Sequence, residues 1–234
     1  MTEWAARRFY KLATVQEEEG GFSVRLDDRP IRTPGKRLLV MPTEVMATRI
    51  ADEWMAQDNL IDPRTMPWTR SANSALDKVA TQRDEVEQHL VGYAGTDLVC
   101  YRAEGPPGLV QRQRQAWDPI LDWLTQRYDV SLRVTSGVMP IAQEDDALPR
   151  LKRAMLPMSD FQLTGFHDLV TLTGSFALGL AAAESAQPAE ELWKISRIDE
   201  EWQAEEWGFD EEAAEAAELK RAAFLHAAAF FRAA

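Results

Sequence analysis

The residues best able to do chemistry are gathered near the C-terminal end of the chain. Residues 199–212 read Asp-Glu-Glu-Trp-Gln-Ala-Glu-Glu-Trp-Gly-Phe-Asp-Glu-Glu. Between Glu184 and Glu218 there are thirteen acidic and two basic side chains, a balance of −11 out of −12 for the whole chain. Carboxylates at this density could ligate an oxygen-preferring cation or attract a basic partner. The two tryptophans favour a partner, because acidic segments that merely solvate a chain rarely contain large aromatics.

A metal centre requires ligands at a defined spacing, which this sequence lacks. Di-iron bundles use Glu-x-x-His pairs, and none of His89, His167 and His226 has a glutamate three residues earlier. The acidic stretch also lacks the alternating ligands and the glycine of a calcium loop. The spacing favours a solvated acidic face, with a carboxylate-dependent metalloenzyme as the alternative.

Nucleotide binding and nucleophilic catalysis find no support in the motifs. Residues 173–176 lack the lysine and second glycine of a phosphate-binding loop. Cys100 lies in a short apolar run and is predicted to be a core residue. His167 and Asp168 are adjacent on a predicted helix, so we expect their side chains to point in different directions. The residues alone therefore indicate no enzyme and no cofactor.

Charge and hydropathy exclude further classes of function. A pI near 4.8 argues against a nucleic-acid partner, since phosphate binding needs a basic surface. No apolar run reaches the roughly 20 residues that span a bilayer, so we expect no membrane insertion. One cysteine cannot form an intrachain disulfide. We expect a soluble, intracellular protein.

If residues 199–207 are helical, the acidic stretch combines anchors with charge. Trp202 and Glu206 then stack one turn apart, as do Gln203 and Trp207. Such a surface offers aromatic side chains that can anchor a partner, together with negative charge that can attract it. The alternative is an ordinary surface helix whose tryptophans pack inward and whose glutamates face water. The residues alone favour this alternative.

The N-terminal part alternates apolar and polar residues, which is typical of strands. The predicted strands cover residues 8–17, 21–26, 31–33 and 38–41. Gly20-Gly21 makes the turn between the first two, because glycine tolerates positive φ. Thr43 is the predicted cap of a helix that follows. The apolar face of this helix consists of Val45, Met46, Ile50 and Trp54.

Helical periodicity dominates from there on. The predicted helices cover residues 72–93, 109–116, 118–128, 145–155 and 161–186, one that starts at Pro188 and runs into the acidic stretch, and one that Asp210 caps. Asp118 is expected to cap the third of these, with Pro119 at its first position. Residues 161–186 are expected to form one buried helix, in which Gly174 and Gly179 allow close packing.

This order of elements predicts an α+β protein. A small N-terminal antiparallel β-sheet unit is followed by a predominantly α-helical C-terminal part. Residues 1–64 hold the β-rich unit with its first helix, and residues 65–234 form the mostly helical domain. No linker long enough to separate independent domains is present, and no internal repeat.

Eight segments carry a resemblance to one family. They are Arg8-Phe9-Tyr10-Lys11, Val-Arg-Leu-Asp-Asp-Arg-Pro-Ile-Arg-Thr-Pro at 24–34, Ile-Ala-Asp-Glu-Trp-Met-Ala-Gln at 50–57, Ile-Asp-Pro-Arg-Thr-Met-Pro-Trp-Thr-Arg at 61–70, Asp-Leu-Val-Cys-Tyr-Arg-Ala at 97–103, Trp117-Asp118-Pro119, Gly174-Ser175, and the 199–212 stretch. Taken in this order, the set resembles the assembly chaperones for the alpha subunit of the F-type ATP synthase catalytic sector. Trp68 departs from the pattern, where a smaller apolar residue is expected.

The resemblance implies a non-enzymatic chaperone without a cofactor. Such a protein binds the unassembled ATP synthase alpha subunit and masks its subunit interface until beta joins. Because mitochondrial members carry a presequence, the start of this sequence favours the bacterial cytoplasm, or the mitochondrial matrix for a trimmed protein. A monomer is favoured, and a general holdase is a second alternative.

The predicted contact surface combines the local charge with the family's motif at the same place. Its residues are Asp199, Glu200, Glu201, Gln203, Glu205, Glu206, Trp207, Asp210 and Glu212. Reversing the charge of Glu200, Glu201 and Glu205 is expected to weaken binding of the alpha subunit without unfolding the protein.

Overall fold

The structure, a computed structural model, describes residues 7–208 and 210–234. Its contacts divide the chain into two compact units, each treated by itself. The first contains residues 1–83, 159–165 and 229–234, and the second contains residues 84–158 and 166–228. The predicted α+β class is confirmed, with a small antiparallel sheet followed by mostly helical chain. The predicted domain boundary near residue 64 stays a prediction.

The sheet of the first unit is built around its second strand. β1 (Ala13–Glu18) and β3 (Arg29–Pro30) pair with β2 (Gly21–Leu26), and so does β4 (Val40–Met41), all antiparallel. Gly20 and Gly21 have φ of 87° and 152°, which the turn after β1 requires. The bounds of β2 are as predicted, whereas the strand expected over residues 8–17 begins only at Ala13. Where residues 31–33 and 38–41 were expected to form strands, only β4 and a single bridge between Arg32 and Leu38 form.

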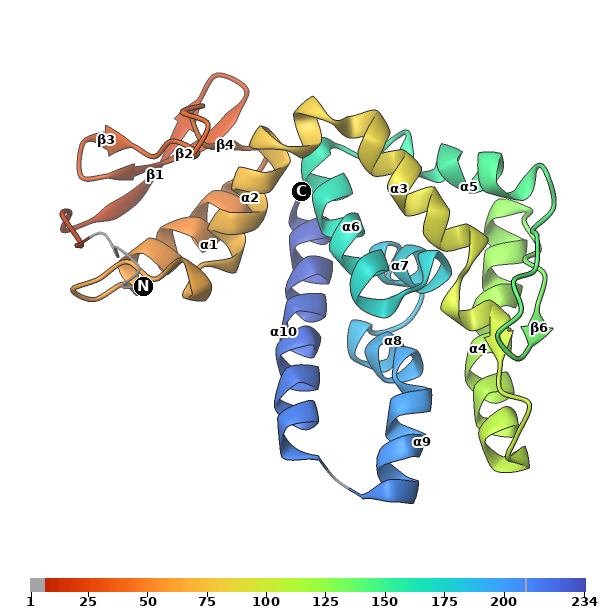
Figure 1. Cartoon of the computed structure of the whole chain (residues 1–234). Coiled ribbons are helices and arrows are strands. Elements are labelled where there is room, and N and C mark those ends of the chain that lie inside the picture. The colour runs from red at the N-terminus through yellow and green to blue at the C-terminus, as the bar shows by residue number, and fades with distance from the viewer. Residues whose placement is uncertain (1–6, 209) are drawn as a thin grey trace. The chain divides into compact units, whose positions relative to one another are not determined.

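α1 (Glu44–Met55) packs against β1 and β2 (Figure 1). The predicted cap is confirmed, because Thr43 Oγ1 accepts a hydrogen bond from Met46 N at 3.4 Å. Met46 and Ile50 are fully buried, as their spacing predicts. Val45 was wrongly assigned to the same face and is exposed.

The family-like segments 50–57 and 61–70 meet at the start of α2 (Pro67–Asp77). Glu53 accepts hydrogen bonds from the backbone N–H groups of Trp68 and Thr69, at 2.6 and 2.8 Å, and so supplies the cap that α2 lacks locally. Burial raises the pKa of Glu53, and these hydrogen bonds oppose the rise. Gln57 bonds to Asp62 N and Thr65 Oγ1, which fixes the loop around the short 3₁₀ turn η1 (Pro63–Thr65).

The helix predicted over residues 72–93 is interrupted. It consists of α2, a 3₁₀ turn η2 (Val79–Thr81) and α3 (Arg83–Gly95). The interruption follows Asp77, whose carboxylate bonds to Thr33 Oγ1 at 2.8 Å and to Gly35 N at 2.7 Å. That contact ties the end of α2 to the loop before β4.

The second unit contains most of the helices. After α3 come η3 (Leu98–Cys100), β5 (Tyr101–Arg102), α4 (Pro107–Tyr128), β6 (Thr135–Ser136), α5 (Ala147–Met155), α6 (Asp160–Thr173), α7 (Phe176–Ala183), α8 (Ala189–Ser196), α9 (Ile198–Trp207) and α10 (Glu211–Ala233). β5 and β6 pair in parallel. α6 begins in the first unit and α10 ends there. Within the described residues, no helix is long and apolar enough to cross a membrane.

α4 is one helix, although two were predicted. Pro119 lies inside it, because Trp117 and Ile120 on either side are buried and hold the helix in the core. Asp118 is therefore not a cap. Its Oδ1 lies 2.8 Å from Nη2 of the buried Arg102.

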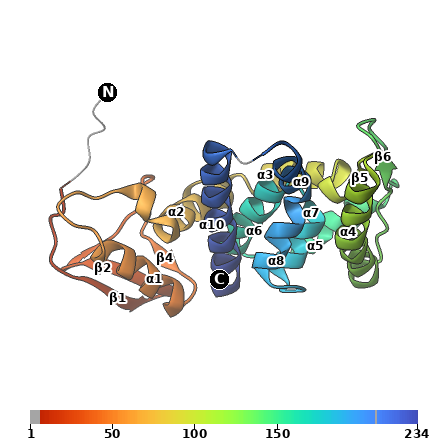
Figure 2. The same cartoon turned by 90° about the horizontal axis from the view of Figure 1, so that it is seen from below.

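The buried helix predicted over residues 161–186 is two helices, α6 and α7. The chain breaks at Gly174, which has a φ of 70°, and Ser175 then caps α7 through Leu178 N at 3.0 Å. Gly179 does allow close packing, since a Cβ there would lie 2.6 Å from Val170 Cγ2. α7 lies between α6 and α4 (Figure 2), and all of its residues are buried.

Asp97 holds the start of α7 from a distant part of the sequence. Its carboxylate accepts hydrogen bonds from Ala177 N at 3.0 Å and from Val99 N at 3.2 Å. The side chain is completely buried, and this desolvation raises the pKa of Asp97 from 3.8 to about 6 despite the hydrogen bonds.

This shift predicts a pH-dependent contribution to stability. A carboxyl group with a raised pKa binds its proton more tightly in the folded state, so its contribution is fully present below pH 3.8 and is lost as pH rises through about 6. Relative to Asp97→Asn, the wild type should therefore gain up to about 3 kcal/mol in free energy of unfolding between pH ~7 and ~4. Urea unfolding of both proteins across this range measures the difference. If the wild type instead lost stability relative to Asp97→Asn on acidification, the hydrogen bonds from the N–H donors would outweigh desolvation, and the pKa of Asp97 would be lowered in the folded state.

Candidate functional site

The nine residues of the predicted contact surface lie together in the second unit. Seven of them, from Asp199 to Trp207, belong to α9, which is helical as expected. Asp210 caps α10, as predicted, by accepting hydrogen bonds from Glu212 N at 3.0 Å and Ala213 N at 3.2 Å. Glu212 lies in the first turn of α10. α8 and α9 are separate helices with a break at Arg197, where one continuous helix was predicted.

Asp199 bonds to the interior of the unit. Its Oδ1 accepts a hydrogen bond of 2.6 Å from Nε2 of Gln113, which is 1% exposed. The amide oxygen of Gln113 in turn accepts a bond of 2.8 Å from Ala103 N. Both ends of this buried amide are therefore satisfied, and α9 is tied to α4 through Asp199.

Glu205 is also engaged within the molecule. Its two oxygens lie 2.8 and 2.9 Å from the guanidinium of Arg112 on α4, a bidentate pair. The hydrogen bond from Arg112 lowers the pKa of Glu205. The same guanidinium lies 4.9 Å from the ring centre of Trp202, and that ring packs on Gly108, where a Cβ would lie only 2.8 Å from it. Trp202 is therefore a packing residue, as the surface-helix alternative proposed.

Arg197 balances Glu200. Its Nη2 lies 2.9 Å from Glu200 Oε1, and its guanidinium lies 5.5 Å from the ring centre of Trp193 on α8. The first turn of α9 thus carries an internal ion pair beside an aromatic ring.

Four residues of α9 have side chains that take no part in these hydrogen bonds and ion pairs. They are Glu201, Gln203, Glu206 and Trp207, and each is exposed. Partial burial and the nearby carboxylates of Glu205 and Glu200 raise the pKa of Glu201, against the opposing effect of Arg112. Trp207 is 82% exposed, which contradicts the alternative in which both tryptophans pack inward. A large indole that gains nothing from the core is available to a partner.

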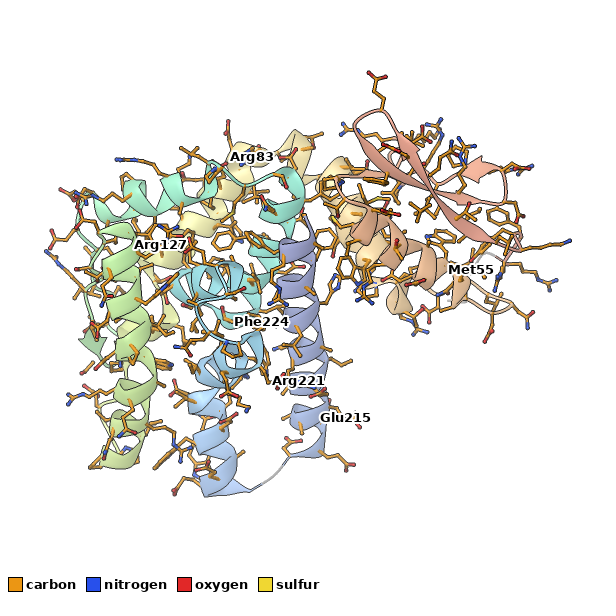
Figure 3. The ribbon with its side chains drawn as sticks, turned by 180° about the vertical axis from the view of Figure 1, so that it is seen from behind. Met55, Arg83, Arg127, Glu215, Arg221 and Phe224 are labelled. Atoms are coloured by element: carbon orange, nitrogen blue, oxygen red, sulfur yellow. The ribbon has the colours of Figure 1, made fainter. Side chains whose placement is uncertain are left out.

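A groove of about 570 Å³ lies between α9 and the start of α10. Its lining residues are Trp193, Arg197, Glu200, Glu201, Gln203, Ala204, Trp207, Gly208, Asp210, Ala213, Ala214 and Ala217. Figure 1 shows α9 and α10 as neighbouring helices that run in opposite directions. Toward its other end, α10 is held against α8 by Phe224, whose ring centre lies 5.7 Å from that of Trp193, and by Arg221, which pairs with Glu190 at 2.7 Å (Figure 3).

Sequence reasoning missed Arg112, Gln113 and the alanines of α10. The first two lie about 90 residues before their partners, so no local pattern connects them. The alanines at 213, 214 and 217 share one helical face, and that spacing could have indicated a shallow surface beside the acidic stretch.

The other residues considered as catalytic or metal-binding candidates are Cys100, His167 and Asp168. Cys100 is fully buried, as predicted, and burial raises the pKa of its thiol to about 12. The expectation that His167 and Asp168 point apart is wrong, because Nδ1 and Oδ1 lie 3.1 Å apart. Among the described residues, no group of three or more His, Cys, Asp or Glu side chains could hold a metal ion.

The tie between α4 and α9 predicts the effect of Gln113→Ala. This change leaves Asp199 Oδ1 and Ala103 N without their partner, so the free energy of unfolding should fall by about 1–3 kcal/mol. The backbone amides of α9 should also exchange hydrogen faster. Gln115→Ala, at an exposed position of the same helix, is the matched control. Equal protection of α9 in the two variants would show that other contacts hold the helix.

Comparison with known proteins identifies the family. The model of the family described as ATP12 chaperone protein matches residues 7–125. The crystal structure of Atp12 from Paracoccus denitrificans superimposes with a TM-score of 0.94 at 48% identity, covering 98% of this chain and 99% of that one. A candidate chaperone from Agrobacterium tumefaciens does so with a TM-score of 0.92 at 38% identity, covering 97% and 85%. Mitochondrial protein atp12 of Schizosaccharomyces pombe is 22% identical over 221 residues, 89% of this chain and 76% of that protein. The chain belongs to the ATP12 chaperone protein family.

Proposed function

We propose that this protein holds the unassembled alpha subunit of the F-type ATP synthase through the exposed face of α9 and the first turn of α10. The observation that carries the proposal is the exposed indole of Trp207 on the same helix as Glu201 and Glu206, whose carboxylates make no hydrogen bond or ion pair within the described residues. This face combines an aromatic anchor with unbalanced negative charge.

A physical need for such a protein follows from the client. A subunit that becomes part of an obligate ring carries a large and largely apolar interface. Exposed alone, that interface promotes aggregation. A chaperone that covers part of it, and that the next subunit can displace, keeps the client competent for assembly.

The role requires binding and no catalysis. Among the acidic residues of α9, Asp199 bonds to the amide of Gln113, Glu200 and Glu205 pair with arginines, and Glu201 and Glu206 are exposed; the thiol of Cys100 is buried. The metalloenzyme alternative has no supporting cluster within the described residues. The relatives include a mitochondrial protein and a bacterial one, so they are consistent with either compartment.

The first test is binding of the purified protein to isolated alpha and, separately, to isolated beta, at two salt concentrations. We expect binding to alpha only, weakened at high salt because exposed charges are screened. Equal protection of unrelated unfolded clients would instead identify a general holdase. Binding to neither subunit would refute the proposal.

The structure also sharpens the charge-reversal test. Lysine at Glu200 or Glu205 would face Arg197 or Arg112 and so disturb the fold as well as the surface. Glu201→Gln combined with Glu206→Lys removes two exposed carboxylates without placing a cation beside Arg112 and Arg197, which attract Glu201. This double variant should bind alpha roughly 10-fold more weakly, about 1.4 kcal/mol, with an unchanged melting temperature.

Glu19→Lys is the control for that variant. Glu19 is an exposed carboxylate in the turn after β1, outside the proposed surface. Glu19→Lys should leave the affinity within about twofold, because an exposed charge that takes no part in a contact is largely screened by salt. Equal weakening by the control and the double variant would mean that net charge alone attracts alpha.

A further inference from the structure

The groove between α9 and α10 has a floor of small side chains. Ala204 lies on α9, and Ala213, Ala214 and Ala217 lie on one face of α10. The rings of Trp193 and Trp207 also line the groove. Its volume of about 570 Å³ is within the range of sites that enclose a small ligand or several side chains. The floor therefore suits apolar groups that project from a partner.

The charge that lines this groove is negative. Glu200, Glu201 and Asp210 contribute carboxylates, and Arg197 is the only basic residue among the described residues of the lining. Arg197 is paired with Glu200, so its charge is already compensated. Asp210 accepts two backbone hydrogen bonds from α10. The carboxylate of Glu201 makes neither an ion pair nor a hydrogen bond within the described residues, so it can still pair directly with an incoming cation.

Trp207 lies in the same lining as Glu201. The face of an indole attracts an arginine or lysine side chain, and the attraction grows when water is excluded. A cation placed between this ring and the carboxylate of Glu201 would interact with both. Acidic segments, including the acidic stretch of a second copy of this chain, are excluded from the groove by like charge.

We infer that the groove binds a basic amphipathic helical segment of the client, with apolar side chains on the alanines and an arginine or lysine between Glu201 and Trp207. The inference rests on the proposed function, since the client is the alpha subunit. Binding of an amphipathic helix in a groove is a common mode of peptide recognition. The charge of the lining selects a basic segment over an acidic one.

A pair of peptides tests the inference on the full chain. One is a synthetic amphipathic peptide of about 18 residues, roughly five helical turns, with leucines on one face and arginines beside them. The other has glutamate in place of every arginine. Calorimetry should show that the arginine peptide binds at least 10-fold more tightly and loses affinity at high salt. Equal binding of the two peptides, or binding of neither, would overturn the inference.

Groove-filling variants locate the binding. Ala213→Leu fills the floor without changing charge, and Ala216→Leu makes the same change at an exposed position of α10 outside the lining. Ala213→Leu should reduce the affinity for the arginine peptide at least 10-fold, and Ala216→Leu should leave this affinity unchanged. Trp207→Ala should weaken it to a similar extent. Because these side chains are exposed, circular dichroism should show intact folds.

A matched charge pair completes the design. Glu201→Gln should reduce the affinity for the arginine peptide several-fold, whereas Glu215→Gln should not, because Glu215 lies on α10 outside the groove (Figure 3). Equal effects of the two substitutions would show that the peptide responds to the general charge of the segment, which contradicts the inference.

The same variants separate this inference from the proposed function. If alpha binds the wild type, Ala213→Leu and Trp207→Ala equally well, the groove is not the contact and only the inference fails. If alpha does not bind the wild type at all, the proposed function fails and the inference fails with it. Self-association that Ala213→Leu abolishes would assign the groove to a second copy and overturn the inference.

Discussion

The hydrogen bond between Gln113 and Asp199 is the contact on which the acidic surface depends. Only Ile198 among the residues of α9 is buried, so the helix cannot be held by apolar packing alone. Hydrogen bonds from α4 to Asp199 and Glu205 also hold the helix in place. Leaving the buried amide of Gln113 without partners would cost more free energy than its hydrogen bonds contribute to stability. The amide therefore favours the one position of α9 in which Asp199 accepts its hydrogen bond. α9 can therefore present charge to solvent while keeping a fixed position.

The motifs of the family resemblance also contain two kinds of residue: those that hold the fold together and those that are exposed without an internal partner. Glu53 caps α2, Asp97 caps α7, and Asp118 pairs with Arg102, so these motif residues determine the fold. In the 199–212 stretch, Asp199 has a comparable internal role. Glu201 and Trp207 do not, since neither completes a cap or an ion pair within the described residues. Motif residues without a structural task are the ones that a binding function accounts for best.

Local signals were sufficient for part of the fold. The bounds of β2, the Thr43 cap of α1 and the Asp210 cap of α10 all follow from neighbouring residues. The break at Gly174 was missed because Asp97, far away in the sequence, stabilises the new helix start. The acidic surface could be located from composition, yet its division into inward and outward carboxylates could not, because Arg112 and Gln113 are brought to it only by folding.

The mixed character of the surface suits a partner that must leave again. An obligate interface is large and mainly apolar, whereas this face offers one exposed indole, a shallow floor of alanines and carboxylates at the rim. Charges at a rim mainly accelerate association and add little to the lifetime of the complex. If the client binds this face as proposed, the lifetime of the complex depends on the anchor at Trp207 and on how well the floor is filled. A subunit that covers a larger apolar area of the client can displace such a chaperone without any input of energy.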